Sequence, residues 1–315
     1  MYKIIQKRKI WISISVVLFV TAIVFISTWG LKLGIDFTGG SLLEVKFGAN
    51  KPNVIEVSDS VKDLKLNSLS VQPSENSFIL RFQDSSEDVH QKVLVSLKKL
   101  NDGKNPVKAE NKGTSTTVVA TTGFEELNFT GIGPSIGQEL QKKAISAIIL
   151  VLIAISLYIS YAFRKVSKPI ASWKYGVATL IALFHDTVIV IGFFALLGKV
   201  WGVEVNTSFV AAVLTVLGFS VHDTIVVFDR IRENLPKSAD NFEDTINRSV
   251  NQTLTRSINT SMTVMFVLMS IVLFGGSSIK YFALALFVGI FFGTYSSIFL
   301  ASPLLVVWNN LKKKI

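Results

Sequence analysis

The sequence contains no cysteine in its 315 residues, so disulfide bonds and thiolate metal sites are excluded. Charged residues are also scarce, because Asp, Glu, Lys and Arg make up 17% of the chain, against about 25% in soluble domains. Half of the residues are hydrophobic. This composition indicates a membrane protein.

The net charge of +10 is compatible with nucleic-acid binding. The Lys and Arg residues, however, gather at the ends of apolar runs and form no single basic stripe. Membrane topology explains this distribution better, so we expect the chain to contact a lipid bilayer and no nucleic acid.

Six runs without Lys, Arg or Glu are each long enough for the roughly 20 residues that cross a bilayer core. They are residues 10–31, 144–163, 175–198, 205–228, 257–279 and 281–311. The first lacks an A-x-A cleavage pattern, so we expect an uncleaved anchor. Lys and Arg are enriched in the loops after the second and fourth runs, and the positive-inside rule therefore places both termini in the cytoplasm.

The predicted fold is a multi-pass membrane protein with six transmembrane α-helices and one α+β extracytoplasmic domain between the first two. Residues 1–31 form the cytoplasmic N-terminus and the first helix, and residues 32–143 form the outer domain. Residues 144–315 form the other five helices and a cytoplasmic C-terminus.

The outer domain has strand and helix patterns in the order β-α-β-β-α-β, which predicts a ferredoxin-like fold. Leu43, Val45 and Phe47 share one face of the first strand. The last strand is expected in TTVVATT, residues 116–122, and His90 is expected to be a solvated helix residue. Since the domain sequence contains no carboxylate pair, metal-spaced cluster or phosphate loop, we expect it to bind or brace something without chemistry of its own.

Two Gly-rich segments border this domain, LGIDFTGGS at residues 33–41 and GIGPSIGQEL at residues 131–140. Turns that need glycines with positive φ explain these segments better than a ligand site does. A proline in the second segment predicts a helix break. We expect both segments to act as joints, with candidate residues Gly34, Asp36, Gly39, Gly40, Gly131, Gly133, Pro134 and Gly137.

Two His-Asp pairs interrupt the apolar runs. His185 and Asp186 fall near the middle of the third run, and His222 and Asp223 fall in the cytoplasmic third of the fourth. An Asp at the centre of a membrane helix costs about 2.5–3.5 kcal/mol, so such residues are functional by default. Burial disfavours a charged carboxylate, and a carboxyl that changes its protonation state inside the membrane is what a proton relay requires.

Arg256 is the natural counter-charge for Asp223 at the cytoplasmic end of the fifth run. It belongs to a polar helical face made up of Gln252, Arg256, Asn259, Thr260 and Thr263. The alternative is that Asp223 has a structural role and holds helices together by pairing. The same alternative applies to His185 and Asp186. A metal site is disfavoured because no H-E-x-x-H or other ligand spacing is present, and no cofactor is expected.

Together these motifs resemble the SecF branch of the SecD/SecF protein-export family, a relative of the resistance-nodulation-division exporters. The resemblance covers nearly the whole chain and rests on LGIDFTGGS, GIGPSIGQEL, LFHDTVIVIGFF, GFSVHDTIVVFDRIREN and NQTLTRSINTSMT. By motif, it implies that Asp223 is the family's intramembrane Asp and Arg256 the Arg that opens the fifth helix. The family usually has Asn before this Asp, whereas this chain has His222, which would couple to Asp223.

The resemblance implies a subunit of the bacterial preprotein translocase in the inner membrane, which uses the proton-motive force to assist protein export and is not an enzyme. It implies SecD, the SecYEG channel, YajC and the translocating preprotein as partners. The alternatives are a small-molecule exporter of the same superfamily, which should have larger outer domains, a purely structural translocase subunit, and a metalloprotease.

Overall fold

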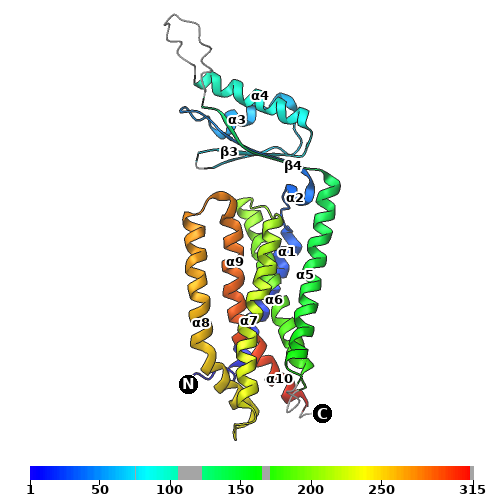
Figure 1. Ribbon diagram of the computed structural model, residues 1–315, viewed down its shortest axis with the longest axis vertical. Coiled ribbons are helices and arrows are strands. Elements are labelled where there is room, and N and C mark those ends of the chain that lie inside the picture. Colours follow the sequence, from blue (N-terminus) through cyan, green and yellow to red (C-terminus); the bar gives the residue numbers. More distant parts are fainter. Residues whose placement is uncertain (75, 106–122, 165–170, 313–315) are drawn as a thin grey trace, which may run out of the picture. The chain divides into compact units, whose positions relative to one another are not determined.

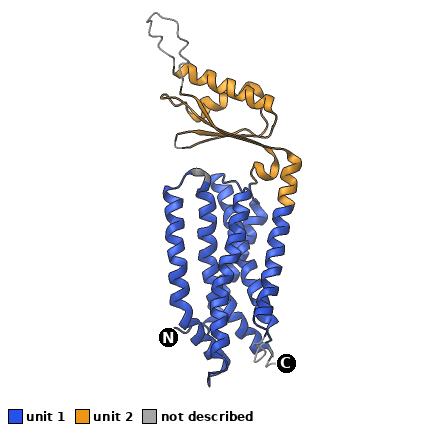
Figure 2. Ribbon diagram, in the orientation of Figure 1, with its two compact units in different colours: residues 1–32, 143–315 blue, residues 33–142 orange. Residues whose placement is uncertain are grey.

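The computed structural model describes two compact units, each with its own hydrophobic core. One unit combines residues 1–32 and 143–315, and the other comprises residues 33–142 (Figures 1 and 2). The residues described are 1–74, 76–105, 123–164 and 171–312.

Six helices within the described residues are long and apolar enough to span a membrane, as predicted. They are α1 (Arg8–Trp29), α5 (Pro134–Ala162), α6 (Trp173–Trp201), α7 (Thr207–Asn234), α8 (Phe242–Phe274) and a last span made of α9 (Ser277–Ser296), the π-helical turn η2 (Ser297–Ala301) and α10 (Ser302–Lys312). Polar side chains cap two of the helix starts. Asn206 Oδ1 accepts from the Phe209 N–H at 3.1 Å in α7, and Asn241 Oδ1 accepts from the Asp244 N–H at 2.9 Å in α8.

Helices α6, α7 and the last span form the centre of the membrane unit. In the most apolar stretches of α6 and of the last span 67% of the residues are buried, against 11% in α1 and α5 and 17% in α8. The peripheral helices turn apolar side chains such as Val17, Leu157 and Phe266 outward. Polar side chains on the inner faces of the central helices are therefore enclosed by protein.

Two glycines one helical turn apart let α9 lie directly against α7. A Cβ atom at Gly289 would lie 2.2 Å from Val216 Cγ2, and one at Gly293 would lie 2.8 Å from Ser220 Cβ. Small residues at such positions allow the backbones of membrane helices to approach closely. The approach brings side chains of α7 and α9 within hydrogen-bonding distance of one another.

The last span departs from α-helical geometry at η2. Pro303 in α10 has no backbone N–H and its ring crowds the preceding turn, which accounts for the interruption. Ser302 Oγ donates to the Ser297 carbonyl oxygen at 3.1 Å, so this carbonyl keeps a partner. π-helical turns often occur at functional sites, and this one follows directly after Ser296.

The outer unit contains a four-stranded antiparallel sheet in the order β2-β3-β1-β4. Its described elements are α2 (Ile35–Thr38), β1 (Gly40–Lys46), α3 (Val54–Ser60), the 3-10 turn η1 (Lys62–Leu64), β2 (Ser70–Pro73), β3 (Phe78–Phe82), α4 (Glu87–Lys104) and β4 (Glu125–Ile132). Leu43 in β1 lies opposite Leu80 in β3 and Phe129 in β4. Leu43, Val45 and Phe47 are all buried, as the alternation predicts.

The strand expected at residues 116–122 lies outside the described residues. The described strand that follows this segment is β4, which pairs with β1 on the side opposite β3. Among the described strands β4 lies at the edge of the sheet, and most of its side chains are exposed. Apolar and polar residues alternate in it only from Leu127 to Thr130, which is a short signal.

The prediction that His90 is solvated is wrong. His90 is 5% exposed, its Nδ1 lies 3.1 Å from Glu87 Oε1, and its Nε2 lies 3.0 Å from Glu126 Oε1 in β4. Its ring also stacks on Phe129 with centroids 3.6 Å apart. The reason is that His90 lies on the buried face of α4, together with Val93, Leu97 and Asn101.

Candidate functional site

The central helices enclose both membrane carboxylates. Asp186 on α6 is fully buried, and Asp223 on α7 is 1% exposed. A buried carboxyl group must be hydrogen-bonded, paired or protonated, so the contacts of these two residues define the candidate site.

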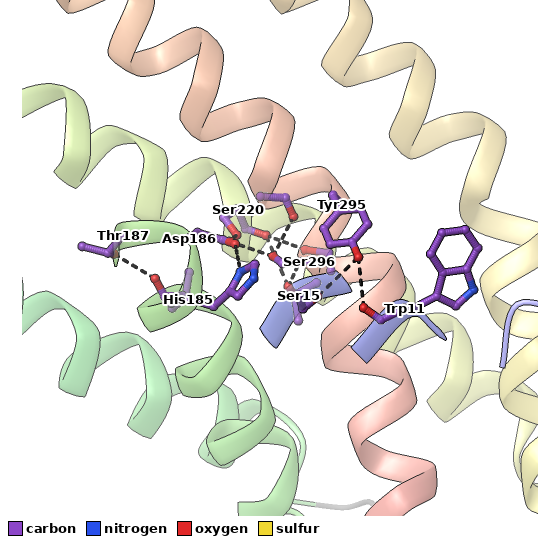
Figure 3. Close-up of polar contacts among 12 residues, drawn as sticks. Trp11, Ser15, His185, Asp186, Thr187, Ser220, Tyr295 and Ser296 are labelled. Carbon is purple, nitrogen blue, oxygen red and sulfur yellow. Dashed lines mark hydrogen bonds and ion pairs between the residues drawn. The ribbon is translucent and has the colours of Figure 1, made fainter. Parts of the chain in front are cut away.

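Asp186 receives hydrogen bonds from two neighbouring helices (Figure 3). Its Oδ2 accepts from Ser220 Oγ on α7 and from Ser296 Oγ on α9, both at 2.7 Å. Its Oδ1 lies 3.0 Å from Nδ1 of the adjacent His185. One carboxyl group thus joins three membrane helices.

Asp223 has a similar set of partners on α8 and α9. Its Oδ2 accepts from Thr294 Oγ1 at 2.9 Å and from Ser261 Oγ at 3.3 Å, and these two hydroxyl oxygens lie 2.6 Å apart. His222 contributes little, because its Nδ1 is 3.9 Å from Asp223 Oδ1 and its side chain is 56% exposed. The buried surroundings of Asp223 therefore consist mainly of hydroxyl groups.

A row of hydroxyl residues on the last span serves both carboxylates. Thr294 bonds Asp223, Ser296 bonds Asp186, and Ser297 Oγ lies 2.7 Å from Thr224 Oγ1 on α7. The sequence interpretation missed these residues. The available signal was the run Thr294-Tyr295-Ser296-Ser297, which interrupts an otherwise apolar stretch of the last helix.

Arg256 faces outward on α8 and makes no hydrogen bond or ion pair through its side chain with another described residue. The expected ion pair with Asp223 is therefore not formed in this structure. The reason is that α8 has two polar faces, and the one carrying Ser257 and Ser261 is buried. The predicted stripe is the other face, where Asn259 is also exposed.

Metal binding finds no support in the part of the chain that the structure describes. No group of three or more His, Asp or Glu residues there is arranged to hold an ion.

The two Gly-rich segments lie side by side in the outer unit, because Gly40 pairs with Ile132 and Ser41 with Gly131 where β1 and β4 meet. Gly39 and Gly40 have φ values of +77° and +129°, which L side chains rarely adopt. Positive φ is therefore confirmed in the first segment, whereas Gly131, Gly133 and Gly137 of the second segment do not have it.

Close backbone approach explains a further glycine. A Cβ atom at Gly137 would lie 2.9 Å from the Phe37 carbonyl oxygen. Helix α5 begins at Pro134, where the sequence predicts a break. The remaining joint candidates need no positive φ and lie in or next to α2 and β4, namely Gly34, Asp36, Gly131 and Gly133.

The hydroxyl groups around each carboxyl can accommodate either protonation state. They donate to a carboxylate, and they can rotate to accept from a protonated carboxyl. Carboxyl groups held in this way inside a helical bundle are characteristic of proton pathways and of structural pairs in membrane proteins. Fold and site together define a polytopic membrane protein with titratable groups at its centre.

Comparison with known proteins identifies the family. The family described as "Protein export membrane protein SecD/SecF, C-terminal" matches residues 112–311, and the "SecD/SecF GG Motif" matches residues 24–50, which include Gly39 and Gly40. The chain belongs to the SecD/SecF family of protein export membrane proteins.

Full-length relatives lie within the same family. The protein translocase subunit SecF of Thermobaculum terrenum is 43% identical over 312 residues, which cover 98% of this chain and 95% of the relative. SecF of Anaerolinea thermophila is 39% identical over 315 residues, with 98% and 95% covered.

The fold also matches a solved structure. The crystal structure of SecDF, a translocon-associated membrane protein from Thermus thermophilus, aligns with a TM-score of 0.79 and 30% identity. The match covers 98% of this chain and 39% of SecDF, so the chain spans about two fifths of that longer protein.

Proposed function

We propose that this chain works as a SecF-type subunit of the bacterial protein translocase and uses the proton-motive force to assist protein export. The observation that carries the proposal is Asp223, a buried carboxyl held by hydroxyl groups of α8 and α9 within the stretch most typical of the family. Its proposed setting is the inner membrane with both termini cytoplasmic, in a complex with SecD, SecYEG and YajC that acts on a preprotein.

In the proposed cycle Asp223 alternates between a protonated form and an anion paired with Arg256. The hydroxyl partners Ser261 and Thr294 can rotate to accept from the first form. The second requires α8 to turn, because Arg256 and the buried Ser257 are adjacent and therefore about 100° apart around the helix axis. A rotation of α8 of this size would exchange a hydroxyl face for a cationic one beside Asp223.

The proton gradient supplies enough energy to bias such a rearrangement. One charge crossing the membrane gains about 2.3 kcal/mol per 100 mV, which shifts a two-state ratio by roughly fiftyfold. Inversion from 1:99 to 99:1 needs about 5.5 kcal/mol. The cycle thus uses either more than one proton or two states of nearly equal free energy.

The outer unit is proposed to be a ferredoxin-like domain that binds or braces a partner. The element order and the sheet order β2-β3-β1-β4 support this class. The Gly-rich segments at residues 33–41 and 131–140 are proposed as the joints through which helix rearrangements reach the domain.

The test is Asp223→Asn in the assembled complex. We expect proton flux and export to fall by roughly ten- to fiftyfold. The upper figure is the shift in the two-state ratio that one charge crossing 100 mV produces, which is lost when residue 223 cannot change its protonation state. Asp229→Asn is the matched control, because this carboxylate lies on the same helix, is 44% exposed and pairs with Arg232. Export and proton flux are measured in vesicles, and co-purification with the SecD-type partner gives the abundance of the complex.

Two results would contradict the proposal. Wild-type flux and export in Asp223→Asn would exclude a relay through this residue. A loss of complex without loss of activity per complex would instead support the purely structural subunit.

A further inference from the structure

The cycle proposed for Asp223 leaves the more deeply buried carboxyl, Asp186, without a role. We propose that His185 and Asp186 form a second proton-binding site whose occupancy is coupled to that of Asp223. This inference rests on the proposed proton-driven function and adds a second site to it.

The first evidence is an imidazole nitrogen without a partner. His185 is 4% exposed, its Nδ1 faces Asp186 Oδ1 at 3.0 Å, and its Nε2 is buried with no hydrogen-bond partner among the described residues. Leaving an N–H buried and unpaired costs more than leaving a lone pair. The favoured arrangement is therefore Nδ1–H donating to the Asp186 carboxylate, with a free lone pair on Nε2.

That lone pair can bind a proton that water delivers. A hydronium ion that reaches Nε2 transfers its proton and becomes a water molecule, which can stay as the acceptor of the new N–H. The His185-Asp186 pair then changes from a net charge of −1 to a neutral imidazolium-carboxylate pair. Release of the proton to water reverses the step.

The second evidence is the set of groups around the pair. Ser220 on α7 and Ser296 on α9 donate to Asp186, and from α1 Phe19 stacks on the His185 ring with centroids 6.2 Å apart. Within the described chain no Lys or Arg forms an ion pair with His185 or Asp186. The titratable groups nearest to these contacts along α7 and α9 are Asp223, three residues beyond Ser220, with His222 beside it, and Tyr295, next to Ser296.

The third evidence is that α7 and α9 connect the two carboxyls, because α9 bonds both of them and α7 carries Asp223 and bonds Asp186 through Ser220. Ser220 and Asp223 are three residues apart on α7, about 4.5 Å of helix rise, and Thr294 and Ser296 are two residues apart on α9. A movement of α9 along α7 that lengthens the bond from Ser296 to Asp186 must also change the bond from Thr294 to Asp223. Protonation of either carboxyl therefore changes the hydrogen bonds of the other.

A purely structural pair makes a different prediction, and His185→Gln separates the two. The glutamine amide can still donate to Asp186 and hold the helices together, but it cannot accept a proton at neutral pH. We expect normal abundance of the complex, a ten- to fiftyfold lower proton flux and a changed pH profile of flux. Thr187→Val is the control, because Thr187 is a buried hydroxyl on α6 that bonds only its own helix, at Leu183 O.

A measurement on the unaltered chain covers the case in which the variant assembles poorly. The chain has three histidines, so ¹⁵N-histidine labelling gives signals from three imidazole rings. Substituting His90 and His222 in turn removes their signals, and the signals that remain belong to His185. We expect Nε2 of His185 to gain a proton as the pH is lowered, and this response to change in Asp223→Asn.

The outcomes distinguish this inference from the function on which it rests. If Asp223→Asn abolishes flux while His185→Gln retains wild-type flux and pH profile, or if His185 does not titrate, the second site is refuted and the first stands. If Asp223→Asn retains full flux, the proposed function itself fails.

Discussion

Single side chains decide what the sequence could and could not predict about the site. Asp186 and Asp223 were predictable because a carboxylate in an apolar run is costly and rarely accidental. Their hydroxyl partners were not, since Ser and Thr in membrane helices often bond their own backbone, as Thr179 does at Tyr175 O. The outward direction of Arg256 was equally hidden, because both faces of α8 are polar.

His90 gives a prediction at this scale. We expect His90→Leu to lower the local stability of the outer unit by about 1–3 kcal/mol, because it removes the shared partner of Glu87 and Glu126. Hydrogen exchange of the β4 amides should accelerate accordingly. His222→Leu is the control, since its side chain is 56% exposed and belongs to the other unit. Equal protection of β4 in both variants would contradict the prediction.

Whole elements were predicted where the sequence pattern reports burial. β1 was found from the alternation of Leu43, Val45 and Phe47, whereas β4 alternates only from Leu127 to Thr130 and has mostly exposed side chains. The close approach of α9 to α7 was not predicted, since it depends on Gly289 and Gly293, whose neighbours only the fold supplies.

The contact between α7 and α9 can be tested with a pair of glycines. Gly289→Val should destabilise the membrane unit by about 1–3 kcal/mol, because a Cβ there meets Val216. Gly218→Val on α7 is the matched control, since nothing lies within 4 Å of a Cβ at that position. Both are compared by thermal or detergent unfolding of the purified protein. Equal stability of the two variants would show that α9 does not depend on this close approach.

The capping box of α3 predicts how the outer unit responds to acid. The Lys104 Nζ, 2.6 Å from Glu56 Oε2, is the main cause that lowers the pKa of Glu56 below its ordinary 4.5, and the Asn53 N–H is the next. This contribution to stability is fully present above pH 4.5 and is lost as the pH falls through the folded value.

Lys104→Met should therefore flatten the fall in stability below pH 4.5, measured by hydrogen exchange across the outer unit. Lys99→Met, an exposed lysine on the same helix, serves as the control. A pH dependence identical to that of the unaltered chain would show that the ion pair contributes nothing in solution.

At the scale of the whole molecule, the bilayer makes the number of spans predictable and leaves their arrangement undetermined. Six runs of sufficient length gave six helices. Their order from centre to periphery could not be inferred, because lipid tails are as apolar as a protein core. Indeed α1 and α5 are the most apolar of the six and lie at the periphery, whereas the less apolar α7 lies at the centre.

The outward polar face of α8 matters most to a copy of the chain that is alone in the membrane. Arg256, Asn259 and Thr263 then turn toward lipid, and a cation inside the bilayer draws water and headgroups inward and thins the membrane around it. A neighbouring helix that covers this face of α8 with polar groups would remove the distortion.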